Sequence, residues 1–187
     1  MDDLYLKLVL EGNASKFSYF IEKYKGMAFS IAFRIVDNRE DAEEIVQDAF
    51  LKAFRSLDKF RKDSKFSTWF YRIVVNSSLS RARNKKPESS IADVDDVADV
   101  VVESVESAYH SLTLFERKLF IQHALEELSA EDRLLLTLHY LNENSIDEIT
   151  GITDIAQENV KMKLHRARNK MYNVLNKNLK SEIQSIL

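Results

Sequence analysis

The chain has 187 residues, with 27 lysines and arginines against 30 aspartates and glutamates, so its formal net charge is −3 at neutral pH. It contains no cysteine, which excludes disulfide scaffolds and thiolate metal sites. No apolar run approaches the roughly 20 residues of a membrane-spanning helix, and MDDLYLKLVL begins with acids where a secretory signal would carry positive charge. We therefore expect a cytoplasmic protein without direct membrane insertion.

The composition predicts an all-α fold. Only three glycines and one proline occur in the chain, which favours long helices with short connections. The segment 85–114 contains Pro87, followed by SSIADVDDVADVVVESVES, whose acids alternate with small and β-branched residues without a helical stripe. We predict two small helical domains, 1–84 and 115–187, joined by an acidic flexible linker over 85–114.

In the first domain we expect helices over about 4–10, 14–36, 39–57 and 67–83. The apolar residues of the third follow the spacing of one buried helical stripe: Ala42, Ile45, Val46, Ala49, Phe50 and Ala53. Its acids lie opposite, and those near the helix start are favoured by the helix dipole. Periodicity alone therefore indicates only an amphipathic helix with a solvated charged face.

The loop DKFRKDSKFST, before Trp69, places Phe60 and Phe66 among the cations Arg61, Lys62 and Lys65. This combination suits single-stranded DNA, because bases stack on aromatic rings while phosphates meet positive charge. The alternative is that both rings belong to the core. For Phe66 the core interpretation is favoured, since this residue stands at a helix start.

In the second domain a leucine series predicts a core: Leu125, Leu128, Leu134, Leu135, Leu138 and Leu141. Two starts resemble capping boxes, Ser129 with Asp132 and Ser145 with Glu148. They predict that one helix follows Ser129 and that the next begins at Ser145.

The last helical pattern is basic, because every ionised side chain from 161 to 180 is a cation. The spacing places Val160, Leu164, Ala167 and Met171 on an apolar side, whereas Lys161, His165 and Arg168 share another side. A basic, solvated helix without a function is the alternative to a DNA-reading helix.

Three motifs in this order resemble the bacterial sigma-70 family: DAEEIVQDAF at 41–50, FSTWFYRIVVN at 66–76 and NVKMKLHRAR at 159–168. The first two are similar to regions 2.2 to 2.4. The third, together with Glu148 and Ile149, is similar to the region 4 helix-turn-helix, here about 145–168. The similarity covers about 17–83 and 119–175, and the compact length points to the extracytoplasmic-function (ECF) subgroup.

The resemblance implies a transcription initiation factor that binds core RNA polymerase, directs it to promoters through their −35 and −10 elements and aids promoter melting. It also implies that 1–84 is a region 2-like domain and 115–187 a region 4-like domain. No enzyme, cofactor or metal is expected, because no catalytic set is visible and the histidines lack metal-ligand spacing: His110, His123, His139 and His165.

The resemblance also implies the site residues of the first domain. Contacts with the β′ clamp helices of polymerase fall on Asp41, Glu44, Gln47 and Asp48. The family also has a pocket for a flipped base of the −10 element, and flipping that base costs a few kcal/mol of unstacking. This pocket and the −10 contacts around it fall on Phe60, Arg61, Ser64, Lys65, Ser67, Asn76 and Arg83. Asn76 is equally well explained as a satisfied buried polar residue.

Contacts with the −35 element fall on the third motif: Asn159, Lys161, Lys163, His165, Arg166 and Arg168. We expect Lys161, His165 and Arg166 near base edges, and Lys163 or Arg168 at phosphates. Two positions depart from the family pattern: Asp154 replaces the usual turn glycine, and Ala156 replaces a capping serine or threonine. Aspartate tolerates the left-handed conformation, so the turn is expected to survive. Gly151, inside the preceding helix, has no functional explanation.

The implied partners are promoter DNA, core polymerase, including its β flap, and an anti-sigma factor, which in this family is often membrane-anchored. The net acidity is unlike that of an autonomous DNA binder, although cations gather at Arg81, Arg83, Lys85 and Lys86. The linker acids are expected to mimic nucleic acid in the RNA-exit path: Asp93, Asp95, Asp96 and Asp99. Two alternatives remain, a stand-alone helix-turn-helix regulator and an interaction protein that sequesters a regulator.

Overall fold

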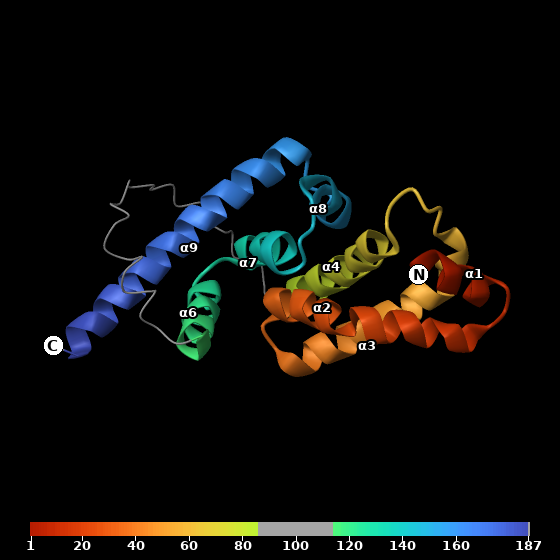
Figure 1. Cartoon of the computed structure of the whole chain (residues 1–187), viewed down its shortest axis with the longest axis horizontal. Coiled ribbons are helices and arrows are strands. Elements are labelled where there is room, and N and C mark those ends of the chain that lie inside the picture. The colour runs from red at the N-terminus through yellow and green to blue at the C-terminus, as the bar shows by residue number, and fades with distance from the viewer. Residues whose placement is uncertain (86–113, 187) are drawn as a thin grey trace.

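The computed structural model describes residues 1–85 and 114–186, and every regular element within these ranges is a helix (Figure 1). The prediction of an all-α fold is therefore confirmed. The predicted linker, except for its two end residues, lies outside the described residues, and so do Lys86 and the acids between 93 and 99. Across the two described ranges, no helix combines the length and apolar character that a membrane crossing requires.

The first domain contains four α-helices and two short 3-10 turns. In chain order these are α1 (Asp2–Leu10), η1 (Ala14–Phe17), α2 (Ser18–Val36), α3 (Arg39–Arg55), η2 (Leu57–Lys59) and α4 (Phe66–Lys85). The helix predicted over 14–36 is divided, because its first turn is the separate 3-10 turn η1. The other three boundaries agree with the prediction to within about two residues.

The core of this domain is aromatic and lies between α2, α3 and α4. Phe20 and Phe70 are fully buried, and the ring centroids of Phe50 and Phe70 are 4.4 Å apart. Phe66 is 3% exposed and contacts the ring of Phe20, with 4.3 Å between centroids. The core interpretation of Phe66 is therefore correct.

One carboxylate fastens α1 to α2. The carboxylate of Asp2 accepts hydrogen bonds from Tyr19 Oη at 2.8 Å, from Lys23 Nζ at 2.5 Å and from Tyr24 Oη. Burial raises the pKa of Asp2, but the three hydrogen bonds and the charge of Lys23 lower it by more, so the pKa lies below its ordinary value of 3.8.

This shift predicts a pH dependence. A carboxyl group whose pKa falls on folding stabilises the protein above its unfolded-state pKa, and that contribution is lost as pH falls through the folded-state value. We expect Asp2→Asn to lower the free energy of unfolding by about 1 kcal/mol at pH 7, and the difference from the wild type to shrink below about pH 4. Urea unfolding at pH 7, 5 and 3 measures it, with the exposed neighbour Asp3→Asn as the control. A constant difference across this range would contradict the assignment.

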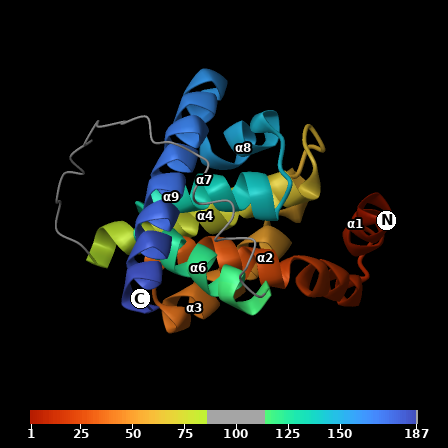
Figure 2. The same ribbon diagram turned by 60° about the vertical axis from the view of Figure 1, so that its left-hand side comes forward.

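The second domain consists of α6 (Leu114–Glu126), α7 (Ala130–Leu136), η3 (Thr137–Leu141), α8 (Ile146–Thr153) and the long α9 (Gln157–Ile186). Figure 2 shows α9 passing along the outside of α6 and α7, which it contacts. Both predicted helix starts are confirmed. Ser129 Oγ accepts from the Asp132 amide at 3.2 Å, and Ser145 and Glu148 form a full capping box.

The predicted leucine core is correct except for Leu141, which is 58% exposed. The physical reason is the segment Thr137–Leu141, which is a turn of π-helix. A π-helix has more residues in each turn than an α-helix, so Leu141 rotates away from the side on which Leu138 is buried. The chain then leaves the helix at Asn142.

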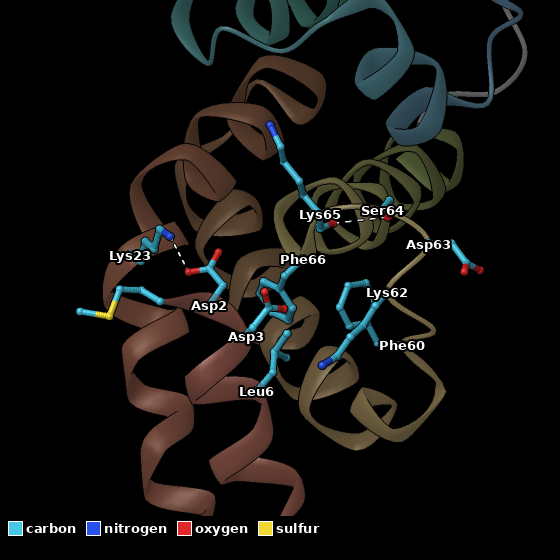
Figure 3. A pocket seen from close by; sticks show the side chains of 11 residues that line it. Asp2, Asp3, Leu6, Lys23, Phe60, Lys62, Asp63, Ser64, Lys65 and Phe66 are labelled. Atoms are coloured by element: carbon cyan, nitrogen blue, oxygen red, sulfur yellow. Dashed lines mark hydrogen bonds and ion pairs between the residues drawn. The ribbon is translucent and has the colours of Figure 1, made fainter.

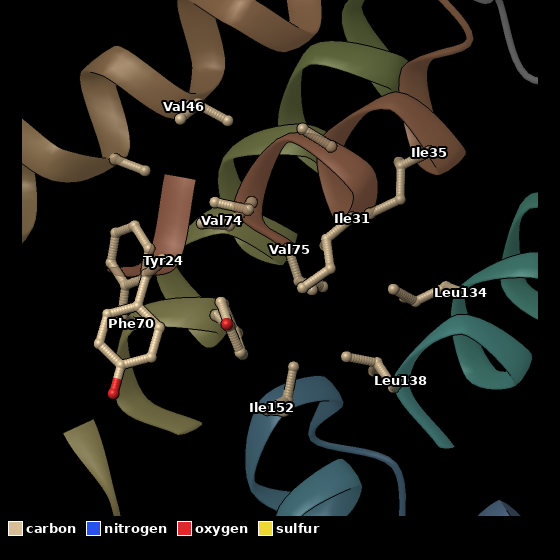
Figure 4. Close-up of a cluster of buried hydrophobic side chains, with 14 of the residues drawn as sticks. Tyr24, Ile31, Ile35, Val46, Phe70, Val74, Val75, Leu134, Leu138 and Ile152 are labelled. Carbon is tan, nitrogen blue, oxygen red and sulfur yellow. The ribbon is translucent and has the colours of Figure 1, made fainter. Parts of the chain in front are cut away.

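The two domains pack against each other, an arrangement for which the sequence offered no prediction. Helix α8 lies against α4, and α7 lies against α2. Buried side chains of both domains form one continuous cluster, in which Leu134, Leu138 and Ile152 face Ile31 and Val75 (Figure 4).

Candidate functional site

The polar face of α3 is divided into an internally bonded part and an exposed part. The N-cap of this helix is Asn38, whose side chain accepts from the Asp41 amide at 2.9 Å. Asp41 is 8% exposed, and its carboxylate and that of Glu44 lie 3.5 and 2.6 Å from the guanidinium of Arg81 on α4. Gln47 and Asp48, one turn further on, are exposed.

This ion-pair cluster changes the interpretation of one predicted cation. Arg81 was counted with the basic group at the end of the first domain, but its guanidinium is engaged by the acids of α3. Arg83, two residues further along α4, is exposed, and its Nε donates a long hydrogen bond to the Leu79 carbonyl oxygen at 3.4 Å. Arg83 is thus better placed than Arg81 to meet a phosphate.

The loop between η2 and α4 borders a cavity of about 600 Å3. Figure 3 shows side chains of this loop and of α1 around the same space. Phe60 is half-buried, with its ring centroid 5.2 Å from that of Trp69, and Lys62 adopts a left-handed conformation with φ of 63°. The loop is therefore anchored by its first aromatic ring while its cations stay exposed.

The structure brings some predicted −10 residues together and leaves others apart. Phe60, Ser64 and Lys65 line the cavity. The remaining four do not: Arg61, Ser67, Asn76 and Arg83. Asn76 is exposed on α4, so its interpretation as a buried polar residue is wrong.

Sequence reasoning missed the contribution of α1 to this cavity. Met1, Asp2 and Asp3 line it, together with Lys23 of α2. The acids at the chain start were weighed only against a secretory signal, and they carry no local pattern that predicts a contact with a loop sixty residues away. Such a contact follows only from how α1 packs on α2.

The helix-turn-helix is formed by α8 and α9. Asp154 ends α8 in the left-handed conformation, with φ 59° and ψ 14°, and its amide donates to the Thr150 carbonyl at 3.0 Å. The expectation that aspartate replaces the turn glycine without loss of the turn is confirmed. Gln157 Nε2, at the start of α9, donates to Asp147 Oδ1 of α8 at 2.6 Å, which links the two helix starts.

Helix α9 separates its apolar and basic sides as predicted. Val160, Leu164 and Ala167 are buried. Five predicted −35 residues are exposed: Asn159, Lys161, His165, Arg166 and Arg168. Lys163 is half-buried, and its ammonium lies 2.7 Å from Glu131 Oε2 on α7, so it differs from the other cations.

Comparison with known proteins matches both halves of the chain. The family model for Sigma-70 region 2 matches residues 20–88, and the model for Sigma-70 region 4 matches residues 121–171. The ECF RNA polymerase sigma factor SigW of Bacillus subtilis is 33% identical over 172 residues, covering 87% of this chain and 90% of the relative. The ECF RNA polymerase sigma-E factor of Escherichia coli K12 is 30% identical over 173 residues, covering 89% and 90%.

Solved structures agree. CnrH in complex with the cytosolic domain of CnrY has a TM-score of 0.64 at 19% identity, covers 92% of this chain and 96% of its own, and shows the shared fold. The sigma factor RpoE in complex with the anti-sigma factor NepR from Bartonella quintana has a TM-score of 0.64 at 25% identity, covering 86% and 96%. The chain therefore belongs to the ECF subgroup of the sigma-70 family and is a non-enzymatic sigma factor that directs RNA polymerase to promoters.

Proposed function

We propose that the exposed part of the α3 polar face binds the β′ clamp helices of core polymerase, and that the region 4-like domain contacts the β flap. Gln47 and Asp48 are free to form intermolecular contacts without breaking the helix cap. Asp41 and Glu44 act with them by holding Arg81, which fixes α3 against α4. We further propose 1–84 and 115–187 as the two functional domains and 85–114 as their linker.

The cavity beside the loop of Phe60 is proposed to receive a flipped base of the −10 element. The half-buried ring of Phe60 offers a stacking surface. The exposed side chain of Lys65, whose ammonium pairs with Glu148 Oε1 at 2.7 Å, can exchange that carboxylate for a neighbouring phosphate. Arg61, Ser67, Asn76 and Arg83, outside the cavity, are assigned to the strand on either side of that base. Their exposed or half-buried positions support this role.

Helix α9 is proposed to enter the major groove of the −35 element with Lys161, His165 and Arg166. Asn159 and Arg168 flank these residues on the exposed surface. Lys163 is assigned to a phosphate contact, because its pairing with Glu131 limits its reach.

This assignment predicts a difference between cations. Lys161→Ala or Arg166→Ala should weaken holoenzyme binding to a −35 duplex by about 1–3 kcal/mol and relax the preference at one base pair. Lys163→Ala, the matched control, should weaken binding to all sequences alike. Competition titrations against duplexes with single substitutions measure both effects. A uniform loss for Lys161→Ala or Arg166→Ala on every duplex would show phosphate contact instead.

The observation that carries the proposal is the order of surfaces on one chain: a polar α3 face, an aromatic and basic loop beside a cavity, and a basic second helix of a helix-turn-helix. Run-off transcription with purified core polymerase and a genomic fragment library tests it. Discrete transcripts that require the protein are expected. DNA binding without any polymerase-dependent transcript would favour the stand-alone regulator.

An anti-sigma factor is the proposed regulatory partner, and the cytoplasm, where polymerase acts, is the proposed location. The RpoE relative is solved with such a factor. Pull-down from the native cell should recover an inhibitor that suppresses run-off transcription, and repeated failure to recover one would argue against this partner. The proposed role of Asp93, Asp95, Asp96 and Asp99 in the RNA-exit path is tested by neutralising them and measuring promoter escape.

A further inference from the structure

An acid stands at the start of the helix that is proposed to read the −35 element. Glu158 is the second residue of α9, and its side chain is exposed. Figure 1 and Figure 2 both show the first turns of α9 extending beyond α7, at the outer edge of the second domain. In a helix-turn-helix the residues near the start of the second helix contact base edges. Glu158 therefore lies where a duplex would meet α9.

Helical spacing places Glu158 on the side of α9 that faces away from the core. Successive residues of an α-helix are about 100° apart, so His165 points within about 20° of Glu158, and Lys161 within about 60°. Both of these side chains are exposed. Ala167 points about 180° away from Glu158 and is buried. Glu158 thus shares one face with two residues that are proposed to approach bases.

Glu158 differs from the other acids of the helix-turn-helix because its carboxylate has no partner. Asp147 accepts a hydrogen bond from the side chain of the first residue of α9 at 2.6 Å. Glu148 completes the capping box of α8, and Asp154 forms an ion pair with α4. Within the part of the chain that the structure describes, the carboxylate of Glu158 makes neither a hydrogen bond nor an ion pair. It is free to accept from a ligand.

The four bases offer this carboxylate different edges in the major groove. An ionised carboxylate only accepts hydrogen bonds. Guanine presents two acceptors, N7 and O6, and thymine presents the acceptor O4. Adenine places its amino group beside the acceptor N7, whereas cytosine presents the N4 amino group without a neighbouring acceptor. A lone carboxylate on the reading face therefore favours cytosine and disfavours guanine and thymine.

We propose that Glu158 is a specificity-determining residue of the −35 contact and accepts a hydrogen bond from N4 of a cytosine. This assignment rests on the proposed function of α9. Side chains one helical turn apart have Cβ atoms about 5–6 Å apart, and stacked base pairs are about 3.4 Å apart. The cytosine therefore lies within one or two base pairs of the base that Lys161 reads. Any other base there leaves the carboxylate unpaired near phosphates, which weakens binding.

Selection of duplexes by the holoenzyme tests this assignment. A promoter that gives a run-off transcript supplies the template, and its −35 segment is randomised. Wild-type holoenzyme should select cytosine at one position. Glu158→Gln should move the preference there to adenine, because glutamine pairs with adenine N6 and N7. Glu158→Ala should remove the preference, and competition titrations should show discrimination against the other bases falling by about five- to 150-fold.

A purely structural role of Glu158 needs its own control, because an acid in the first turn of a helix also stabilises the helix through its dipole. Glu40 occupies the same place in α3, as its second residue, and is exposed. Glu40→Gln should therefore keep the −35 selection of the wild type. Lys161→Ala should lose selection at a neighbouring position and keep the cytosine.

Three results would overturn the assignment of Glu158. The first is an unchanged cytosine preference in both Glu158 variants, whatever their stability in urea. The second is a uniform gain in affinity for every duplex, which reports only repulsion between the carboxylate and phosphates. The third is a preference for a base other than cytosine at the position that the variants change. Failure of the wild-type holoenzyme to select any −35 sequence would instead contradict the proposed function of α9, and the assignment with it.

Discussion

Replacing Gln47 with alanine and Asp48 with lysine is expected to reduce polymerase-dependent transcription by at least about tenfold. The lysine reverses the charge that α3 presents to the proposed interface, and like charges juxtaposed across an interface cost several kcal/mol. Both side chains are exposed and point away from the core on which α3 packs. The fold should be unaffected, since neither residue takes part in the Asn38 cap or the Arg81 cluster. Run-off transcription and a direct titration of core polymerase measure the effect.

A variant with the same change in net charge supplies the control for this experiment. Glu22 is exposed on α2 and, among the described residues, pairs only with Lys25 of the same helix, so Glu22→Lys should transcribe as the wild type does. Equal loss in both variants would indicate a general charge effect. Unchanged polymerase binding by the α3 variant would remove α3 from the interface.

The largest expected effect on stability is that of Phe70→Ala. Its ring is fully buried, stacks on Phe50 and contacts Phe66 and Tyr24. Truncating a buried phenylalanine costs about 3–5 kcal/mol through lost transfer energy and the cavity left behind, and a domain has only about 5–15 kcal/mol to lose. Chemical denaturation should therefore show a much lower midpoint.

Leu79→Ala on the same helix is the matched control, because Leu79 is 41% exposed. A substitution at such a site changes stability by about 0.5 kcal/mol or less. A shift for Phe70→Ala no larger than that of Leu79→Ala would mean that the aromatic cluster is not the core of the first domain.

The parts of the fold that the sequence predicts are those with local causes. The capping box of Ser145 and Glu148 depends on residues three apart, and the tolerance of Asp154 for a left-handed turn depends on its own side chain. The separation of Val160 and Leu164 from Lys161 on α9 follows from helical spacing alone. Each of these features could be predicted because no distant partner takes part.

The parts that escaped prediction depend on distant partners. The pairing of Lys65 with Glu148 joins residues 83 positions apart. Arg81 on α4 pairs with Asp41 on the neighbouring helix α3. Leu141 was assigned to the core because α-helical spacing was assumed, and the sequence does not show that Thr137–Leu141 forms a π turn. The site was therefore predicted as a set of residue types, whereas its internal bonds required the packed structure.

The cations that face α8 have a consequence for the ionic-strength dependence of DNA binding. A lysine or arginine that binds a phosphate normally releases a counterion condensed on the DNA. Each such contact makes the slope of log affinity against log salt concentration more negative by about 0.7 for a single strand. Lys65 already pairs with Glu148, and Arg72 pairs with Asp154, so part of what DNA displaces from these cations is protein charge. The isolated protein should thus bind a −10 strand with a shallower salt slope than its count of cations implies.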